Sequence, residues 1–305
     1  MRQRSGRLAI SIALALAAAL FMAACGGPTR PSRNPGGGNN GGGNQQPPPN
    51  NPPVIDSITI QGTRAKEPAS FADVAETVAI TAKVHDDETA VDQLQYEWTA
   101  PVGTFSGTGA SVTWQAPATA TTPGDVTITL KVLEKYGFPG GPQAFQHDVT
   151  GTAKLSLHDS VKEVGDMARQ FLLDFSDTNI KDANYIMRNF AEPSKCPEPN
   201  EVTDEREQIT THFRYFVMQN FRIGAAAVTV AFGGRCPVDG RRGDACALVP
   251  SFWDSIDLRD NARRSVDGTD IVAAIYSPVD VRWWLCASNY DGHLVQGVGP
   301  SFYIR

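Results

Sequence analysis

The stretch HDVTGTAKLSLHDSVKEVGDMARQFLLDFS, residues 147–176, decides the fold class, because a strand pattern gives way to a helix pattern within it. Residues 147–157 form a short run with β-branched and apolar side chains, which predicts a strand. From residue 161 onward, apolar side chains recur at spacings of three and four. This predicts an amphipathic helix over residues 159–176, with Asp159 or Ser160 as its N-cap. The chain therefore changes from one kind of domain to another near residue 158.

Residues 54–158, before that change, are predicted to form an all-β domain, because short apolar and β-branched runs alternate there with turn residues. In residues 126–132 every second side chain is apolar, which is typical of a strand with one face in a core. Trp98 and Trp114 are then expected core residues. The expected strands are residues 54–62, 77–85, 93–99, 111–115, 125–133 and 147–157.

The stretch Gln95-Tyr96-Glu97-Trp98, with GTFSG at residues 103–107 and VTWQAP at residues 112–117, is similar to bacterial immunoglobulin-like domains of the PKD and cadherin-like kind. The resemblance implies a β-sandwich that serves as a spacer, or as an adhesion or carbohydrate-contact module, in surface proteins. It implies no catalytic residues. The acidic run of residues 86–88 offers three side chains to a calcium ion that needs six to eight ligands, so a solvated turn is the favoured interpretation.

Residues 159–305 are predicted to form an α+β domain, because helices come first and a run of antiparallel strands follows. Two more helices are expected, a short one at residues 183–190 and a third at residues 203–221. The Asp291-Gly292 pair is typical of a hairpin turn. The expected strands are residues 225–232, 245–258, 270–276, 279–288 and, after that turn, 293–304.

This order of elements, with FLLDF at residues 171–175 ahead of residues 185–190, resembles the NTF2-like cone fold. The resemblance implies helices packed on a curved antiparallel sheet. It also implies that the mouth of the cone serves as a small-molecule pocket or as a dimerisation face, and some members of that superfamily are enzymes.

The first 24 residues have the pattern of a secretory signal peptide, in which Arg2, Arg4 and Arg7 precede an uncharged apolar run. The run ends in Met22-Ala23-Ala24-Cys25, which resembles the bacterial lipobox. The resemblance implies that Cys25 becomes the acylated N-terminus, whose acyl chains, such as palmitate, anchor the protein in a membrane. Gly26 in place of Asp implies an outer-membrane address if the host has two membranes, on the periplasmic side or exposed at the surface. An uncleaved anchor, or a signal peptide cut near Ala24, remain alternatives.

The segment of residues 25–53 is predicted to be a disordered linker that follows the acylated cysteine. Residues 26–53 contain eight glycines, eight prolines and no large apolar side chain, so they cannot bury enough surface to offset their ordering entropy. The linker would lift the folded part clear of the membrane, or would be a tail without a distance requirement.

The net charge argues against a nucleic-acid partner. The whole chain carries −6, and without residues 1–24, which hold three arginines and no acidic residue, 24 basic and 33 acidic residues leave −9. Such a chain has no general attraction to phosphate backbones. The expected partner is the membrane, through the lipid anchor, together with an envelope protein, a carbohydrate or a small molecule as ligand.

Four cysteines follow Cys25, and all of them lie in the α+β region: Cys196, Cys236, Cys246 and Cys286. In an exported protein an even set predicts disulfides. Their spacing contains no C-x-x-C pair and completes no zinc pattern with His212 or His293, so metal binding and free thiols are the weaker alternatives. Among the three connectivities, we favour Cys236 with Cys246 and Cys196 with Cys286. The second bridge closes a ring of about 90 residues and could stabilise the domain by roughly 4 kcal/mol.

Aromatic and basic residues supply the candidate ligand-binding side chains. Adjacent Trp283 and Trp284 must point to opposite faces of a strand, so one should enter the core. An exposed tryptophan beside an arginine could stack on a sugar ring or a planar ligand, unless a helix or the other domain covers it. Arginines at residues 235, 241 and 242 crowd one loop, where interleaved acids favour a solvated surface of mixed charge over an anion site. The candidates are Trp253, Arg282, Trp283 and Trp284.

No catalytic motif is present in the sequence. There is no Gly-x-Ser-x-Gly, no His-Glu-x-x-His and no cysteine with an evident partner histidine, so we predict no catalytic residue, metal or cofactor. The sequence thus favours a lipid-anchored cell-envelope protein whose domains bind or organise other molecules without turnover. The alternative is an NTF2-like small-molecule-binding domain or enzyme, with its pocket in the C-terminal domain.

Overall fold

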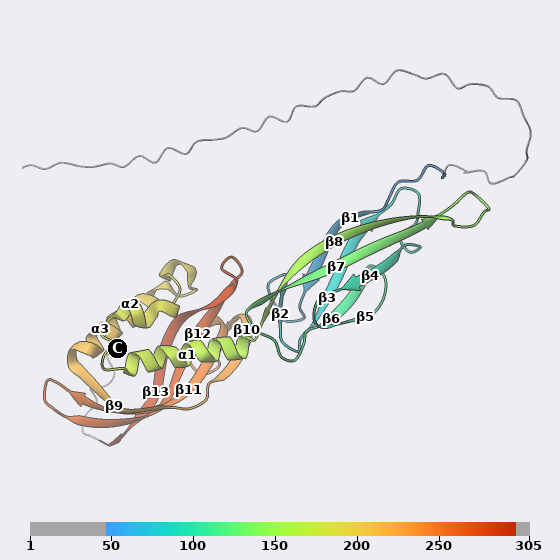
Figure 1. Cartoon of the computed structure of the whole chain (residues 1–305). Coiled ribbons are helices and arrows are strands. Elements are labelled where there is room, and N and C mark those ends of the chain that lie inside the picture. The colour runs from blue at the N-terminus through green and yellow to red at the C-terminus, as the bar shows by residue number, and fades with distance from the viewer. Residues whose placement is uncertain (1–46, 297–305) are drawn as a thin grey trace, which may run out of the picture. The chain divides into compact units, whose positions relative to one another are not determined.

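The structure, a computed structural model, describes residues 47–296 (Figure 1). The predicted signal peptide, Cys25 and most of the predicted linker lie outside the described residues, and so does the end of the last predicted strand. The described chain is mostly β, with several antiparallel pairings and one curled sheet.

Two four-stranded sheets precede the first helix (Figure 1). One has the order β1-β3-β6-β5 and the other β2-β8-β7-β4, and all neighbours are antiparallel except β2 and β8. The strands are β1 (Val54–Gln61), β2 (Phe71–Asp73), β3 (Thr77–His85), β4 (Gln95–Thr99), β5 (Thr104–Ser106), β6 (Ser111–Gln115), β7 (Gly124–Tyr136) and β8 (Phe145–His158). The six predicted strands are all present. The three-residue strands β2 and β5 are too short for a periodic pattern and were not predicted.

The two sheets share a core that both sets of strands build by alternation. Ile80 and Trp114 from one sheet and Ile128 and Leu155 from the other belong to the same buried cluster. Trp114 is fully buried as expected, whereas Trp98 is only partly buried and donates through Nε1 to the carbonyl of Gly109 at 2.9 Å.

The rest of the chain places helices before a run of antiparallel strands, as predicted, and five strands form one sheet. The sheet has the order β10-β11-β12-β13, and β9 pairs with the second half of β11. It curls into half a barrel, with helices against one face (Figure 1). The elements are α1 (Ser160–Ser176), α2 (Ala183–Ile186), η1 (Met187–Asn189), η2 (Pro193–Lys195), α3 (Pro199–Tyr215), β9 (Phe216–Ile223), β10 (Ala227–Arg235), β11 (Arg242–Asp257), β12 (Arg263–Ser277) and β13 (Arg282–Gln296).

The helix α1 begins where the sequence places it. The Asp159 carboxylate accepts a hydrogen bond from the backbone N–H of Lys162 at 3.0 Å, so Asp159 is the N-cap. Phe171 and Leu172 are buried on its inner face, where they share a core with Ile209 of α3 and Val272 of β12. The helices thus cover the sheet with the apolar faces that their periodicity predicts.

Several predicted element boundaries are wrong, and two of the errors come from long-range pairing. The third helix ends at Tyr215 and not at residue 221, because Phe216 starts a strand whose partner is Asp257, far away in the sequence. The hairpin at Asp291-Gly292 does not form either. Strand β13 continues through it and places Gly292 opposite Gly268 of β12.

Both disulfides connect the cysteines that the sequence analysis pairs. Cys196, after η2, is bonded to Cys286 of β13, with the Cα atoms 5.6 Å apart. Cys236 is bonded to Cys246 of β11 across the arginine-rich loop, with a Cα separation of 5.2 Å. Such bonds are typical of an oxidising, extracytoplasmic compartment.

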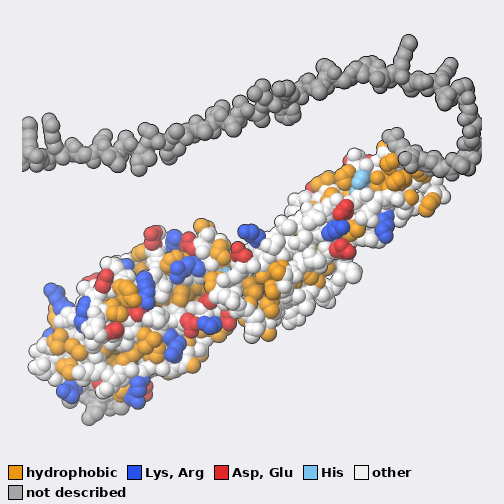
Figure 2. Space-filling view, viewed as in Figure 1, with side chains coloured by type: hydrophobic (Ala, Val, Ile, Leu, Met, Phe, Trp, Pro, Cys, Tyr) orange, Lys and Arg blue, Asp and Glu red, His pale blue; other side chains and the backbone are white. Residues whose placement is uncertain are grey.

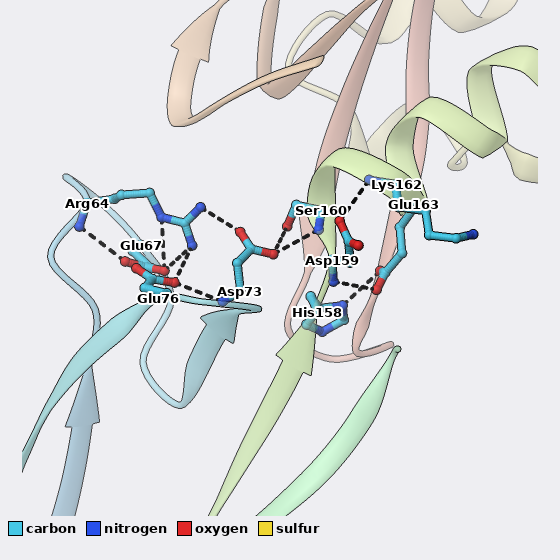
Figure 3. Close-up of polar contacts among 9 residues, drawn as sticks. All are labelled: Arg64, Glu67, Asp73, Glu76, His158, Asp159, Ser160, Lys162 and Glu163. Carbon is cyan, nitrogen blue, oxygen red and sulfur yellow. Dashed lines mark hydrogen bonds and ion pairs between the residues drawn. The ribbon is translucent and has the colours of Figure 1, made fainter. Parts of the chain in front are cut away.

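The end of β8 and the start of α1 lie in a network of polar contacts that joins the two folded regions (Figure 3). Arg64 makes ion pairs with Asp73 at 2.7 Å and Glu76 at 2.9 Å, and it also pairs with the buried Glu67. The other oxygen of Asp73 accepts hydrogen bonds from the backbone N–H and the hydroxyl of Ser160, at 2.8 and 2.6 Å. Asp73 therefore ties the Arg64 cluster to the first turn of α1, where a negative charge is favourable.

An aromatic cluster packs beside this network. Phe71 of β2 stacks on His158 at 4.9 Å and meets Phe232 and Tyr276 edge-on, at 5.3 and 4.8 Å. The Arg64 guanidinium lies 5.1 Å from the Phe232 ring centroid. A residue of the N-terminal sheets is thereby part of the core of the C-terminal region.

Candidate ligand-binding pocket

A cavity of about 240 Å³ opens between α1, α3 and the curled sheet. Two lining residues, Gln208 and Asn289, are exposed, so the cavity reaches solvent between α3 and β13. The lining residues are Phe171, Leu172 and Phe175 of α1, Glu205, Gln208, Ile209 and His212 of α3, Phe216, Arg241, Trp253, Val266, Asp270, Ser288, Asn289, Tyr290 and Gly292.

Aromatic rings form much of the wall on the helix side. Phe171 and Phe175, one turn apart on α1, stack with centroids 6.4 Å apart. The His212 ring lies 4.6 Å from Phe175 and 5.4 Å from Phe216. These contacts hold the rings in place without filling the cavity, which gives a ligand an apolar surface.

The sheet side of the wall contains a second aromatic pair, Trp253 and Tyr290, with centroids 4.5 Å apart. The pair depends on glycine at two facing positions. A Cβ atom at Gly292 would lie 2.1 Å from Cε1 of Tyr290, and one at Gly268 would lie 2.7 Å from its hydroxyl oxygen. The glycines therefore leave room for the Tyr290 ring against the strands. The buried Nε1 of Trp253 has no hydrogen-bond partner among the side chains and backbone groups that the structure describes.

Glu205 is a carboxyl group on the apolar face of α3. It occupies the same stripe as Val202 and Ile209, and it is only 8% exposed. Burial raises the pKa of Glu205 to about 8, although a hydrogen bond with Ser288 and the charge of Arg241 act in the opposite direction. The side chain is thus mostly protonated at neutral pH in the empty pocket.

Asp270 brings a second buried carboxyl group from β12. It is 7% exposed, and the hydroxyl of Ser251 donates to its Oδ2 at 2.5 Å. Burial raises the pKa of Asp270 to about 7. Its charge also raises the pKa of Glu205, which indicates that the two groups interact across the cavity.

Among the described lining residues, Arg241 is the one permanently charged basic side chain. Carboxylates already surround it. Its Nη2 lies 2.9 Å from Glu201 Oε2, and its Nε lies 3.5 Å from Asp239 Oδ2. It also donates through Nη1 to the carbonyl of Ser288. The guanidinium is therefore held at the edge of the cavity by partners of its own.

His212 adds a neutral imidazole. Burial, and secondarily the charge of Lys181, lower the pKa of His212 to about 4. The ring is uncharged at neutral pH and can accept or donate one hydrogen bond to a ligand.

Of the four candidate residues from the sequence, the structure brings only Trp253 into this pocket. Trp283 is a core residue, 1% exposed, that packs on Phe232 and Tyr276. Trp284 lies on the opposite face, as expected, with the Arg282 guanidinium 3.9 Å from its ring centroid. Its Nε1 donates to Asp280 at 3.1 Å, so Arg282 and Trp284 form a partly exposed stack away from the cavity.

Three polar residues of the pocket are not among the candidates that the sequence predicts: Glu205, Asp270 and His212. Glu205 carries a detectable signal, because it interrupts the apolar stripe of α3 at helical spacing from Val202 and Ile209. Asp270 lies in the middle of β12, directly after a run with several polar residues, so its burial gives no comparable signal in the sequence. His212 came up only as a possible zinc ligand.

The surface around the arginine-rich loops carries mixed charge. Figure 2 shows basic and acidic side chains interspersed on the visible face of the C-terminal region. Arg259 and Arg264 both pair with Asp257, at 2.6 and 3.2 Å, but the Arg264 and Asp257 side chains are almost fully buried, so this contact belongs to the interior and not to a solvated surface. Within the described part of the chain, no three metal-ligating side chains come together, and no helix is both long and apolar enough to cross a membrane.

A comparison with known protein families, with curated proteins and with solved structures finds no match to this chain.

Proposed function

We propose that this protein is an exported, lipid-anchored envelope protein that binds a small molecule in the pocket of its C-terminal domain. In this proposal the N-terminal sheets form an immunoglobulin-like spacer, and the C-terminal domain is an NTF2-like cone. The lipobox-like sequence ending at Cys25 supports the anchor, and the two disulfides support export.

The cavity carries the proposal. Its wall combines aromatic rings with two buried carboxyl groups, a neutral imidazole and an unpartnered indole N–H among the described residues. Burying a carboxyl group costs free energy even where it keeps one serine partner, as Glu205 and Asp270 do, so a purely structural core would have little reason to gather two of them beside a cavity. Apolar walls with a few converging polar groups are typical of ligand sites.

The size of the cavity limits the ligand. Sites for drug-sized molecules measure roughly 300–1,000 Å³, and this one, at about 240 Å³, is smaller. The ligand should therefore be a compact molecule with an apolar part facing Phe171 and Phe175 and a polar part facing Glu205 and Asp270.

The test is a screen of small fragments against the wild-type protein and the variant Gln208→Trp. Gln208 is exposed at the mouth, so tryptophan there should obstruct the cavity without disturbing the core. Thr210→Trp, exposed on the same helix and away from the cavity, is the matched control. We expect fragments that shift the melting temperature of the wild type and the control but not of Gln208→Trp. If every fragment that binds the wild type also binds Gln208→Trp equally well, the proposal is wrong.

General acid–base catalysis in the same pocket is a second candidate. The observation that favours it is the pKa of Asp270, raised to about 7, beside a Glu205 whose pKa is about 8, since groups poised near neutrality can donate and accept protons. Recovery of each bound fragment unchanged after long incubation would support binding alone, and conversion that Glu205→Gln abolishes would support catalysis.

A further inference from the structure

The acidic groups of the pocket lack a basic partner of their own among the described residues. Glu205 and Asp270 are both nine-tenths buried, and the one permanent cation in the lining, Arg241, is paired with Glu201 and Asp239. His212, the other basic group, is uncharged at neutral pH. An anionic ligand would meet two acids and no free positive charge, whereas a cation would find two carboxyl groups able to ionise beside it.

The aromatic lining favours the same sign of charge. Phe171, Phe175, Phe216, Trp253 and Tyr290 all line the cavity. The face of an aromatic ring carries negative charge density and attracts a cation, most strongly where water is excluded. An ammonium group placed among these rings would therefore gain from the rings as well as from the carboxylates.

Resting on the proposed function, we propose that the ligand is a small organic cation, an amine or quaternary ammonium compound with an apolar body, held between Glu205, Asp270 and the aromatic wall. The buried Nε1 of Trp253, a donor without a partner among the described residues, adds a place for a hydroxyl or carbonyl oxygen on the same molecule.

Binding of such a cation should release protons. In the empty pocket burial raises the pKa of Glu205 and of Asp270 and keeps both groups largely neutral. A cation beside them lowers both pKa values, so protons leave as it binds. The charged groups that face Glu205 are Arg241, Asp270 and Glu201. The charge of Lys181 acts on His212. No other charged side chain lines the described cavity. Affinity should rise with pH from about 6 to about 8.5, because ionised carboxylates then no longer have to lose a proton.

The experiment compares three probes of similar shape on the full chain. Phenyltrimethylammonium carries a permanent charge, tert-butylbenzene is its neutral counterpart, and benzoate is anionic. Calorimetric titration in buffers of different ionisation enthalpy measures affinity and proton release together. We expect the cation to bind roughly tenfold more tightly than the neutral probe, to release protons near pH 7, and to bind more tightly as pH rises.

The variant Glu205→Gln with Asp270→Asn should lose this preference and the proton release while still binding the neutral probe. Glu207→Gln, exposed on the same helix, is the control and should behave like the wild type. Glutamine and asparagine imitate the protonated acids, so the fold should persist, and a melting curve checks this. Benzoate or tert-butylbenzene binding at least as tightly as the cation, or no saturable binding of the cation, would overturn the inference. The pocket itself would still stand if other fragments bind and the Gln208→Trp plug blocks them.

Discussion

At the scale of single residues, the pocket depends on titratable groups that burial keeps uncharged at neutral pH. Burial keeps Glu205 largely protonated and His212 unprotonated at neutral pH. Both states avoid a desolvated charge, and both leave the group able to form a hydrogen bond. The pocket is therefore close to neutral when empty, and its charge can change when a ligand arrives.

These residues predict an unusual dependence of stability on pH. A carboxyl group whose folded pKa is raised binds more protons in the folded state, so stability falls as pH rises from the unfolded value near 4.5 towards about 8 for Glu205. His212, with its pKa lowered to about 4, acts in the opposite direction below about 6.5. Above pH 6.5 only the carboxyl effect remains, and the melting temperature should fall between about pH 6.5 and about pH 8.

Thermal melts across this range, with Glu205→Gln and the surface control Glu207→Gln, check the prediction. The Glu205→Gln protein should show a flatter profile, and the control should follow the wild type. Burial also raises the pKa of Asp270 and the pKa of Glu76, a residue of the polar network, each to about 7. Both groups therefore lower the melting temperature as pH rises, so Glu205→Gln should retain part of that decline. An identical slope in wild type and Glu205→Gln would contradict the assignment.

At the scale of elements, local sequence patterns are sufficient to predict a helix or strand wherever that element buries one face along its whole length. The strand β7 alternates and α1 carries its apolar stripe, so both were predictable. The end of α3 was not, because the apolar run at Phe216 suits a helix as well as a strand, and its pairing with Asp257 decides between them. The pocket was harder still to predict, since it needs α3, β12 and β13 to meet, and only Trp253 among its residues was anticipated.

The disulfides give a prediction at this scale, since each one ties two elements together. The chain-entropy account assigns roughly 4 kcal/mol to the bridge that spans 90 residues, and roughly 3 kcal/mol to the one that spans 10. The Cys196→Ser, Cys286→Ser protein should therefore lose more stability in urea than the Cys236→Ser, Cys246→Ser protein. The reverse order would indicate that packing around Cys236 and Cys246, which lie in a small separate core cluster, outweighs loop entropy.

At the scale of the whole molecule, Phe71 is the residue that joins the two cores. It lies on β2 of the N-terminal sheets, yet its ring packs on Phe232 and Tyr276 of the curled sheet. Phe71→Ala should cost about 3–5 kcal/mol and should separate one calorimetric transition into two. Lys66→Ala, which removes an exposed side chain whose Nζ donates to the carbonyl of Gly233 at 3.5 Å, should leave a single transition. A wild-type protein that already melts in two steps would show that the polar and aromatic contacts do not couple the regions.

The last prediction concerns how the whole molecule is held in the cell. If Cys25 is acylated, its acyl chains, at about 0.8 kcal/mol for each buried methylene, hold the protein on a bilayer, and nothing in the described helices can replace them as a span. Cys25→Ser should therefore lose label from a radioactive fatty acid and move from the membrane fraction to the soluble fraction of the envelope. The pocket, more than 100 residues away in sequence, should keep its fragment binding in the released protein. Release together with intact binding would separate anchoring from recognition, whereas a variant that stays in the membrane fraction without label would show that another part of the chain or a partner retains it.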